Sequence, residues 1–401
     1  MAMRARLDRL AGRALTALKD DILPFWLRLE DRAQGGHFAG MDNAGRIDRS
    51  AAKSTVFVAR ILWTLSEIHR VLALPECLDQ AARTRRFLAD RLVDPRDGGL
   101  WWSATGDGLP LETDKHVYAQ AFAIYGLAAH ARATGDTDSL AAAQRLFRLV
   151  EERARDRTGS YGEAFDAEWR PLENRRMAAG GLVGARTANT HLHLIEAYTG
   201  LLEASPDAAV RSALRALLEL FLARFLAAGA SHTHALLDAT LRPLPGPVSY
   251  GHDIEASWLM VAAARAVGDD ELAARIAEAA TGLARSAAAG QGSDGGWITE
   301  RRADGTTDSR RVWWVQAEAA IGLADAALRT GDLGLMARAE RTWDFIERVM
   351  MDRAGGEWFW RVDEAGRPDP SMPKVAAWKE PYHQARACLE LIERARRARQ
   401  G

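Results

Sequence analysis

The segment DPRDGGLWW at residues 94–102 is one of five related segments that recur along this chain of 401 residues. Each combines an acidic residue, glycine and an aromatic residue, a composition typical of a tight turn between regular elements. The other four are EDRAQGGHF (30–38), DRTGSYGEAF (156–165), SDGGW (293–297) and MDRAGGEWFW (351–360). A period of about 65 residues explains their spacing if a sixth member, in the loop-like segment near residue 229, lacks the paired glycines. The sequence therefore predicts six units that cover nearly the whole chain.

The segments between these turns have the spacing and composition of long helices. Residues 54–70, 116–133 and 208–227 are examples, rich in the helix formers Ala, Leu, Arg and Glu. Alternating Val, Ile and Thr are scarce, so strands are expected only as short hairpins in the loops. Two helices in each of six units give about twelve helices, and six helical hairpins closed into a ring form an (α/α)6 barrel. We predict this all-α fold, one domain over residues 1–401, and a cleft framed by inner helices and glycine-rich turns.

The composition excludes several classes of protein. Lys and Arg total 53 against 54 Asp and Glu, so the net charge of -1 lacks the basic excess of a nucleic-acid binder. The two cysteines, Cys77 and Cys388, are too few for a disulfide framework. No run approaches the roughly 18 apolar residues of a membrane span, and residues 1–26 predict a first helix rather than a signal peptide. We expect a soluble cytoplasmic protein with neither nucleic acid nor membrane as a partner.

Tryptophan is unusually frequent, with 13 residues in a chain whose aromatic residues make up only 7%. An indole offers a flat apolar face and one N–H donor, which suits stacking against amphipathic ligands. Sugars are such ligands, because their C–H faces are apolar and their edges carry hydroxyl groups. The bias favours a sugar-binding cleft, although a single tryptophan is as often a core residue.

Polar residues at helical spacing on apolar segments are the candidates for chemistry. Asn189 and His193 are four residues apart and share one helix face, whereas His191 lies about 200° from His193 around the axis. The two histidines cannot converge on one ion, so no zinc site is expected here.

A second candidate segment holds His252, Glu255 and Trp258 at three-residue steps along one face. A carboxylate beside a histidine fixes its tautomer and raises its basicity, so Glu255 is predicted to orient His252 as an acid/base residue. The second histidine of an H-E-x-x-H metal helix is absent. Trp258 is included among the expected substrate-binding residues.

The remaining candidates lie in three further helices. Trp314 and Glu318 are four residues apart, which places a stacking surface beside a carboxylate. Trp378 and His383 flank a proline at an expected helix start. Arg60 lies on a mostly apolar face and requires an acceptor, either a carboxylate or a ligand oxygen.

Together these segments resemble the N-acylglucosamine 2-epimerase superfamily and, within it, the cellobiose 2-epimerases. The motifs are KHVYAQAFAIYGL (115–127), NTHLHLIEAYT (189–199), GHDIEASWL (251–259), WWVQAEA (313–319) and WKEPYHQARACLELI (378–392). The resemblance implies an (α/α)6 barrel that interconverts C2 epimers, or an aldose and its ketose, at the reducing end of glucose- and mannose-type sugars. Members usually need no cofactor, so neither a cofactor nor a metal is expected.

The resemblance also implies roles for individual residues. His252 and His383 match the catalytic pair, His193 a third essential histidine, and Arg60 the arginine of the site. The matching substrate positions are Asn189, Tyr118, Glu255, Glu318, Trp314 and Trp378. After ring opening, one histidine would remove the C2 proton to give an enediolate and the other would return a proton to the opposite face. Arg60 would polarise the C1 or C2 oxygen, and His193 would assist ring opening or position a hydroxyl.

Two departures from the family pattern bear on the substrate. Cellobiose 2-epimerases commonly read W-K-C-P-Y-H-N, whereas Glu380 and Gln384 replace the cysteine and the asparagine here, and residues 171–186 also differ. A monosaccharide enzyme, either a D-mannose 2-epimerase or a mannose isomerase, is therefore the main alternative. The assembly is expected to be a monomer or a homodimer.

Two other classes of protein remain as alternatives. An inverting glycoside hydrolase would need two opposed carboxylates about 6.5–9.5 Å apart. Its candidates are Glu163, Asp166, Glu255 and Glu318. A non-catalytic sugar-binding protein would use the tryptophans but not the histidines. Hydrolysis products would favour the first class, and binding without turnover the second.

Overall fold

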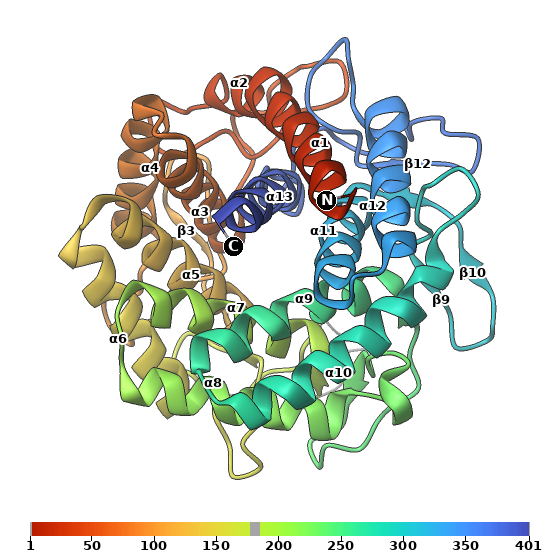
Figure 1. Ribbon diagram of the computed structural model, residues 1–401. Helices are drawn as coiled ribbons and strands as arrows, with labels where there is room; N and C mark the ends of the chain where they lie inside the picture. Colours follow the sequence, from red (N-terminus) through yellow and green to blue (C-terminus); the bar gives the residue numbers. More distant parts are fainter. Residues whose placement is uncertain (1, 177–184, 401) are drawn as a thin grey trace.

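The computed structural model describes residues 2–176 and 185–400, and in these ranges six inner and six outer helices alternate along the chain (Figure 1). The inner helices are α3 (Thr55–Leu72), α5 (Val117–Thr134), α7 (Ala188–Ala204), α9 (Tyr250–Val267), α11 (Trp313–Thr330) and α13 (Tyr382–Gln400). The outer helices are α1 (Ala2–Ala17), continued by η1 (Leu18–Ile22) and α2 (Leu23–Leu27), α4 (Pro75–Phe87) with η2 (Leu88–Leu92), α6 (Thr137–Arg153), α8 (Ala208–Leu220) with η3 (Phe221–Phe225), α10 (Asp270–Ala287), and α12 (Leu333–Phe345) with η6 (Ile346–Met350). Each inner helix packs on the next and α13 packs on α3, so the ring closes and the predicted (α/α)6 barrel is confirmed.

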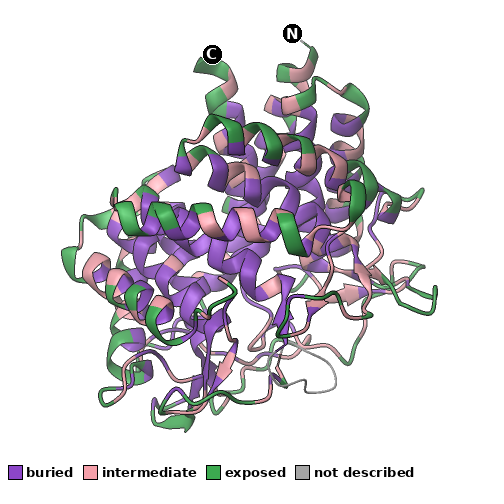
Figure 2. Cartoon of the chain, turned by 90° about the horizontal axis from the view of Figure 1, so that it is seen from below, coloured by how far each residue is buried: buried purple, intermediate pink, exposed green. Residues whose placement is uncertain are grey.

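Short strands gather at one end of the barrel, and Figure 2 shows these loops on the side away from both termini. They are β1 (Lys53–Ser54), β2 (Ser103–Ala104), β3 (Pro110–Glu112), β4 (Lys115–His116), β5 (Ala164–Phe165), β6 (Arg186–Thr187), β7 (Leu236–Leu237), β8 (Val248–Ser249), β9 (Glu300–Arg301), β10 (Thr307–Asp308), β11 (Arg311–Val312) and β12 (Arg361–Val362). The strand before each inner helix from α3 to α11 pairs antiparallel with a strand of the next unit. A bridge between Met41 and Val375 connects the first unit to the last. These pairs tie neighbouring units together around the mouth of the barrel.

The sixfold repeat is visible in the turns that join outer helices to the mouth. Each turn is closed by one isolated antiparallel bridge, at Glu30–His37, Val93–Leu100, Arg155–Tyr161, Leu226–Thr233, Gln291–Trp297 and Met351–Trp358. The fourth of these lies where the sixth turn was predicted, although it contains only Gly229, with a φ of 67°. The short helix η4 (Ala228–Ala230) lies in this turn, and η5 (Ala288–Gly290) precedes the next.

In four units the fourth residue of the inner helix uses its side chain to bond the turn that follows a neighbouring outer helix. This side chain accepts a hydrogen bond from the backbone N–H at the far end of the turn. The pairs are Gln120 with Leu100 (2.9 Å), His191 with Tyr161 (3.2 Å), Asp253 with Thr233 (2.7 Å) and Gln316 with Trp297 (2.7 Å). His191 therefore belongs to the scaffold, which agrees with the expectation that it does not converge with His193.

At the opposite end of the barrel, three inner helices end and the next outer helix begins within two residues. A glycine in the left-handed conformation ends the inner helix, and the aspartate that follows caps the outer helix with its side chain. The pairs are Gly135–Asp136, Gly268–Asp269 and Gly331–Asp332. Such short connections fix each outer helix antiparallel to its inner partner.

The inner helices are buried on nearly all sides, whereas the outer helices bury one face and expose charged residues on the other (Figure 2). None of the described helices combines the length and the apolar composition that a membrane span requires.

Inner helices α3 and α5 approach so closely that one glycine is required between them. A Cβ at Gly126 would lie 2.6 Å from the carbonyl oxygen of Ala59. We expect Gly126→Ala to lower the free energy of unfolding by about 1–3 kcal/mol, because backbone cannot yield as a side chain does. Gly12→Ala in α1 is the matched control, since no atom lies within 4 Å of its Cβ position and helix propensity favours alanine. Denaturant unfolding compares the two variants, and equal stabilities would contradict this packing.

Candidate active site

A cleft of about 260 Å³ opens at the mouth of the barrel, among the first turns of the inner helices. It is lined by Arg60, Tyr118, Asn189, His193, His252, Glu255, Val312, Trp313, Trp314, Trp360, Trp378 and His383. Nine of the eleven site residues expected from the sequence are in this lining. Tyr118, Asn189, Trp314 and His383 are each the second residue of their helix, so the barrel itself brings these positions together.

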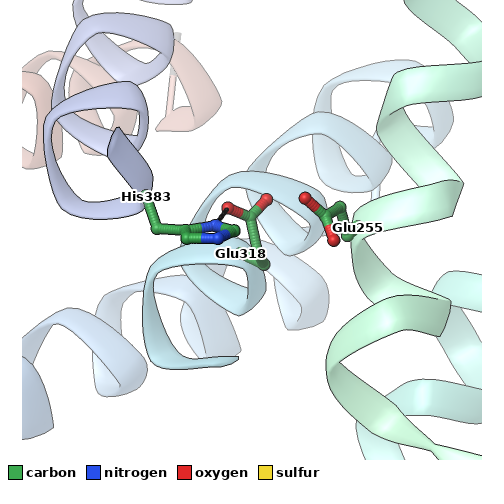
Figure 3. A group of neighbouring side chains, drawn as sticks. All are labelled: Glu255, Glu318 and His383. Atoms are coloured by element: carbon green, nitrogen blue, oxygen red, sulfur yellow. Dashed lines mark hydrogen bonds and ion pairs between the residues drawn. The ribbon is translucent and has the colours of Figure 1, made fainter. Parts of the chain in front are cut away.

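His383 is oriented by a buried carboxylate. Its Nδ1 lies 2.8 Å from Oε1 of Glu318, as Figure 3 shows, and Glu318 is itself fully buried behind the cleft. With Nδ1–H donating to the carboxylate, Nε2 carries the lone pair, and the structure shows no partner for it among the described residues. Burial and the positive charges of Arg60 and Arg386 hold the pKa of His383 well below its usual value. His383 is therefore a neutral base at neutral pH.

His252 is held by an aromatic contact. Its ring centroid lies 4.9 Å from that of Trp314, and the His383 ring lies 5.6 Å from the same indole. None of the described residues forms a hydrogen bond with the His252 ring. Burial, followed by the charge of His193, lowers its pKa to about 4. The two imidazoles thus contact the same indole, and both are neutral near pH 7.

Glu255 does not orient His252, which differs from the sequence prediction. Its carboxylate instead accepts a hydrogen bond from the guanidinium of Arg386. Residues three apart on a helix can interact, but a guanidinium offers a buried carboxylate a stronger partner than an imidazole. Burial and the neighbouring Glu318 raise the pKa of Glu255 to about 7, so this cleft residue can hold and release a proton near neutral pH.

His193 has its own carboxylate partner one turn along α7. Its Nδ1 lies 2.9 Å from Oε2 of Glu196, which leaves Nε2 on the side of the cleft. Burial alone would raise the pKa of Glu196, but Arg386 and His193 lower it to about 2. Glu196 is therefore ionised and fixes the tautomer and orientation of His193.

Arg386 connects the three carboxylates that lie behind the cleft. It donates to Glu196 on α7, to Glu255 on α9 and to Glu318 on α11, and is fully buried. Two of these carboxylates hold the rings of His193 and His383. Neither Arg386 nor Glu196 was among the residues expected from the sequence.

Arg60 meets its requirement for an acceptor within the protein. Its Nη1 donates to Glu380 at 2.6 Å and its Nη2 donates to the Tyr118 hydroxyl at 2.7 Å. Its guanidinium also packs 4.1 Å from the centroid of the Phe122 ring. The hydroxyl hydrogen of Tyr118 remains available to the cleft, because this oxygen accepts from Arg60.

The remaining cleft residues suit a sugar. Asn189 is at the cleft and its Oδ1 has no hydrogen-bond partner among the described residues, so it can accept from a ligand hydroxyl. Trp313, Trp314, Trp360 and Trp378 supply apolar walls for stacking. Trp313 and Trp360 were missed, although the frequency of tryptophan indicated that such residues exist.

Two expected substrate-binding residues lie elsewhere. Trp258 faces a separate cavity nearer the other end of the barrel, and its Nε1–H donates to Glu318 at 3.1 Å. It follows His252 by six residues, which places it nearly two turns deeper along α9. Glu318 is enclosed by Trp258, His383 and Arg386, so it acts behind the cleft rather than in it.

The substituted residues of the last motif also have defined places. Gln384 is fully buried and donates to Glu357 and to the Glu380 carbonyl, so it does not reach the cleft. Of the divergent segment 171–186, residues 177–184 lie outside the described residues.

Glu255, Glu318 and His383 are the described residues that could hold a metal ion. Their ligand atoms lie within 4.8 Å of one another (Figure 3). Arg386, however, already donates to both carboxylates, and His383 Nδ1 is bonded to Glu318. A cation would have to displace the guanidinium, so this geometry favours an ion-pair network over a metal centre.

The sequence pattern of the N-acylglucosamine 2-epimerase (GlcNAc 2-epimerase) family matches residues 36–387. The cellobiose 2-epimerase of Bacteroides fragilis is 38% identical over 92% of this chain and 95% of its own. The chain belongs to the N-acylglucosamine 2-epimerase family. The structure of cellobiose 2-epimerase from Bacillus thermoamylovorans superposes with a TM-score of 0.93 at 33% identity, over 96% of this chain and 100% of that one.

Other members of the N-acylglucosamine 2-epimerase family are more distant. The D-mannose isomerase of Thermobifida fusca is 26% identical over 83% of this chain and 83% of its own. Membership of this family and the similarity to cellobiose 2-epimerases show that this protein is an epimerase or isomerase. The hydrolase interpretation is left without support. Of the four candidate carboxylates, Glu163 and Asp166 do not line the cleft. Glu255 and Glu318 share Arg386 and have oxygens within 4.8 Å, too close for an inverting pair.

Proposed function

We propose that this protein is a sugar 2-epimerase that interconverts glucose- and mannose-configured residues at the reducing end of a disaccharide such as cellobiose. The observation that carries the proposal is the pair of neutral imidazoles, His252 and His383, both in contact with Trp314 in a tryptophan-lined cleft. The similarity to cellobiose 2-epimerases over nearly the whole chain supports the substrate. A D-mannose 2-epimerase or mannose isomerase is the second candidate, because a D-mannose isomerase is among the more distant relatives.

The chemistry begins with ring opening, because only the free C1 aldehyde makes the C2 proton acidic. One neutral histidine takes the C2 proton, and the electron pair of the C–H bond forms the enediolate with its charge on the C1 oxygen. The Tyr118 hydroxyl and Arg60 stabilise that charge as it develops. The second histidine returns a proton to the other face of C2. That histidine takes its proton from solvent in the cleft, and the first histidine releases the C2 proton to solvent, so both imidazoles end neutral.

His193 has a supporting role in this scheme. Its ring is fixed by Glu196. The centroid of the His193 ring lies 5.2 Å from the centroid of the Tyr118 ring. From this position it moves the proton between O1 and O5 during ring opening and closing.

We further propose that residues 1–401 form one catalytic domain, which acts as a monomer or homodimer without a metal or other cofactor. Arg386 supports the last point, since it satisfies the carboxylates that a metal would need.

The pH profile is expected to extend unusually far toward acid for a histidine enzyme. His252 has a pKa lowered to about 4, and that of His383 also lies well below 6.5. A base with a lowered pKa stays neutral until the pH falls through that lower value. We therefore expect kcat/KM to hold between pH 6.5 and pH 5 and to fall only below that. A fall centred near pH 6.5 would contradict the buried, neutral pair.

The function is tested by separate overnight incubations with cellobiose and with D-mannose, after dialysis against EDTA and without added metal, followed by chromatography. Glucosyl-mannose from cellobiose, formed faster than any product from mannose, is the expected result. Glucose or fructose from mannose alone would replace the proposal with the monosaccharide epimerase or the isomerase. Free glucose from cellobiose would contradict both.

A further inference from the structure

Glu380 lies directly behind Arg60 and is fully buried. Its Oε1 accepts from Nη1 of Arg60 at 2.6 Å, and its Oε2 accepts from the backbone N–H of Tyr382 at 3.0 Å. The carboxylate therefore joins α3 to the start of α13 one residue before His383. It does not line the cleft, so it acts on a ligand only through Arg60.

The charge balance of the cleft depends on this contact. Arg386 faces three carboxylates, and the buried Lys379 beneath Trp313 is paired with Glu357 at 2.9 Å. Arg60 is the cation that lines the cleft itself, and Glu380 is its carboxylate partner. His252 and His383 add no charge at neutral pH. His193 is paired with Glu196, so the described cleft holds no cation without a carboxylate partner.

We propose that Glu380 is a specificity-determining positioning residue, which fixes Arg60 against Tyr118 and cancels its charge so that the cleft accepts neutral aldoses and rejects anionic sugars. This inference rests on the proposed function, because it concerns the same cleft. A sugar acid places a permanent carboxylate where the neutral substrate has its C1 carbonyl. Arg60 and Arg386 already face carboxylate partners, so in the low-dielectric cleft that charge finds no unpaired cation. The charge of the enediolate is transient, and the Tyr118 hydroxyl, held by Arg60, donates a hydrogen bond to it.

Two open-chain probes separate charge from shape. Cellobionate ends in a carboxylate, whereas cellobiitol ends in an uncharged alcohol and is otherwise closely similar. Calorimetric titration gives the Kd of each probe without turnover. We expect Glu380→Gln, which keeps an oxygen acceptor for Arg60 but removes the charge, to bind cellobionate about tenfold more tightly than the native protein does. The affinity for cellobiitol is expected to change less than twofold.

Two further variants control for structure. Glu380→Asp keeps the charge and is expected to retain the weak binding of cellobionate. Asp325→Asn removes a buried carboxylate further along α11 that is paired with Arg394 instead of Arg60, and is expected to change neither Kd.

Three outcomes would overturn the inference. They are an unchanged Kd for cellobionate in Glu380→Gln, an equal gain for both probes, and the same gain in Asp325→Asn. Failure of the native protein to bind cellobiitol would instead contradict the proposed function, and the inference with it.

Discussion

Replacing His383 with asparagine is expected to lower kcat/KM for epimerisation by about 10³-fold, and His252→Asn by a similar factor. Each substitution removes the ring nitrogen that takes or returns the C2 proton. In His383→Asn the side-chain amide can still donate to Glu318, so the buried network behind the cleft keeps its partner. The loss should therefore appear in kcat, with folding and sugar binding retained.

Exchange of the C2 proton with deuterated water measures this loss directly. The matched control is His232→Asn, because His232 is a partly buried histidine on the loop before β7 and outside the cleft. It should exchange at the native rate. Survival of exchange in both His383→Asn and His252→Asn would show that the pair is wrongly assigned.

Arg386→Met is expected to have the second largest effect, on stability and on catalysis together. Removing the guanidinium leaves Glu196, Glu255 and Glu318 buried without their common partner. Breaking a buried ion pair from one side costs about 3–5 kcal/mol, measured as the free energy of unfolding. Where the variant folds, kcat should fall about 100-fold, because Glu196 and Glu318 no longer hold His193 and His383 in place.

Arg394→Met is the matched control for that experiment. Arg394 is a buried arginine two turns further along α13, and it pairs with Asp325 and Glu390, neither of which holds a cleft histidine. We expect it to lose stability while keeping the native kcat. A native kcat in Arg386→Met, or an equal loss in Arg394→Met, would contradict the role given to Arg386.

The fold could be predicted because each repeat contains a turn segment that can be recognised from its local sequence. Turn segments with aspartate, glycine and an aromatic residue recur at one period, and even the weak member near Gly229 closes with the same bridge as the others. The faces of the inner helices were also predictable, since Asn189 and His193 share a side at helical spacing. Nine expected residues meet at the cleft for that reason.

Contacts between distant helices could not be predicted in this way. Arg386 is one of several arginines in α13, and the helix is buried on almost every side, so its sequence does not indicate which arginine faces the axis. Glu255 was assigned to His252 because the two are near in sequence, but Arg386 competes from 131 residues away. The carboxylate partner of Arg60 could not be predicted either, because Glu380 lies 320 residues from it in the sequence.

The central claim is that two histidines transfer the C2 proton of a neutral disaccharide. Incubation of the native protein with cellobiose in deuterated water, followed by NMR of the reducing-end residue, tests it most directly. The account predicts that glucosyl-mannose forms with deuterium at C2, because the returning histidine exchanges its proton with solvent. Glucosyl-mannose without deuterium at C2, or hydrolysis to glucose, would contradict it.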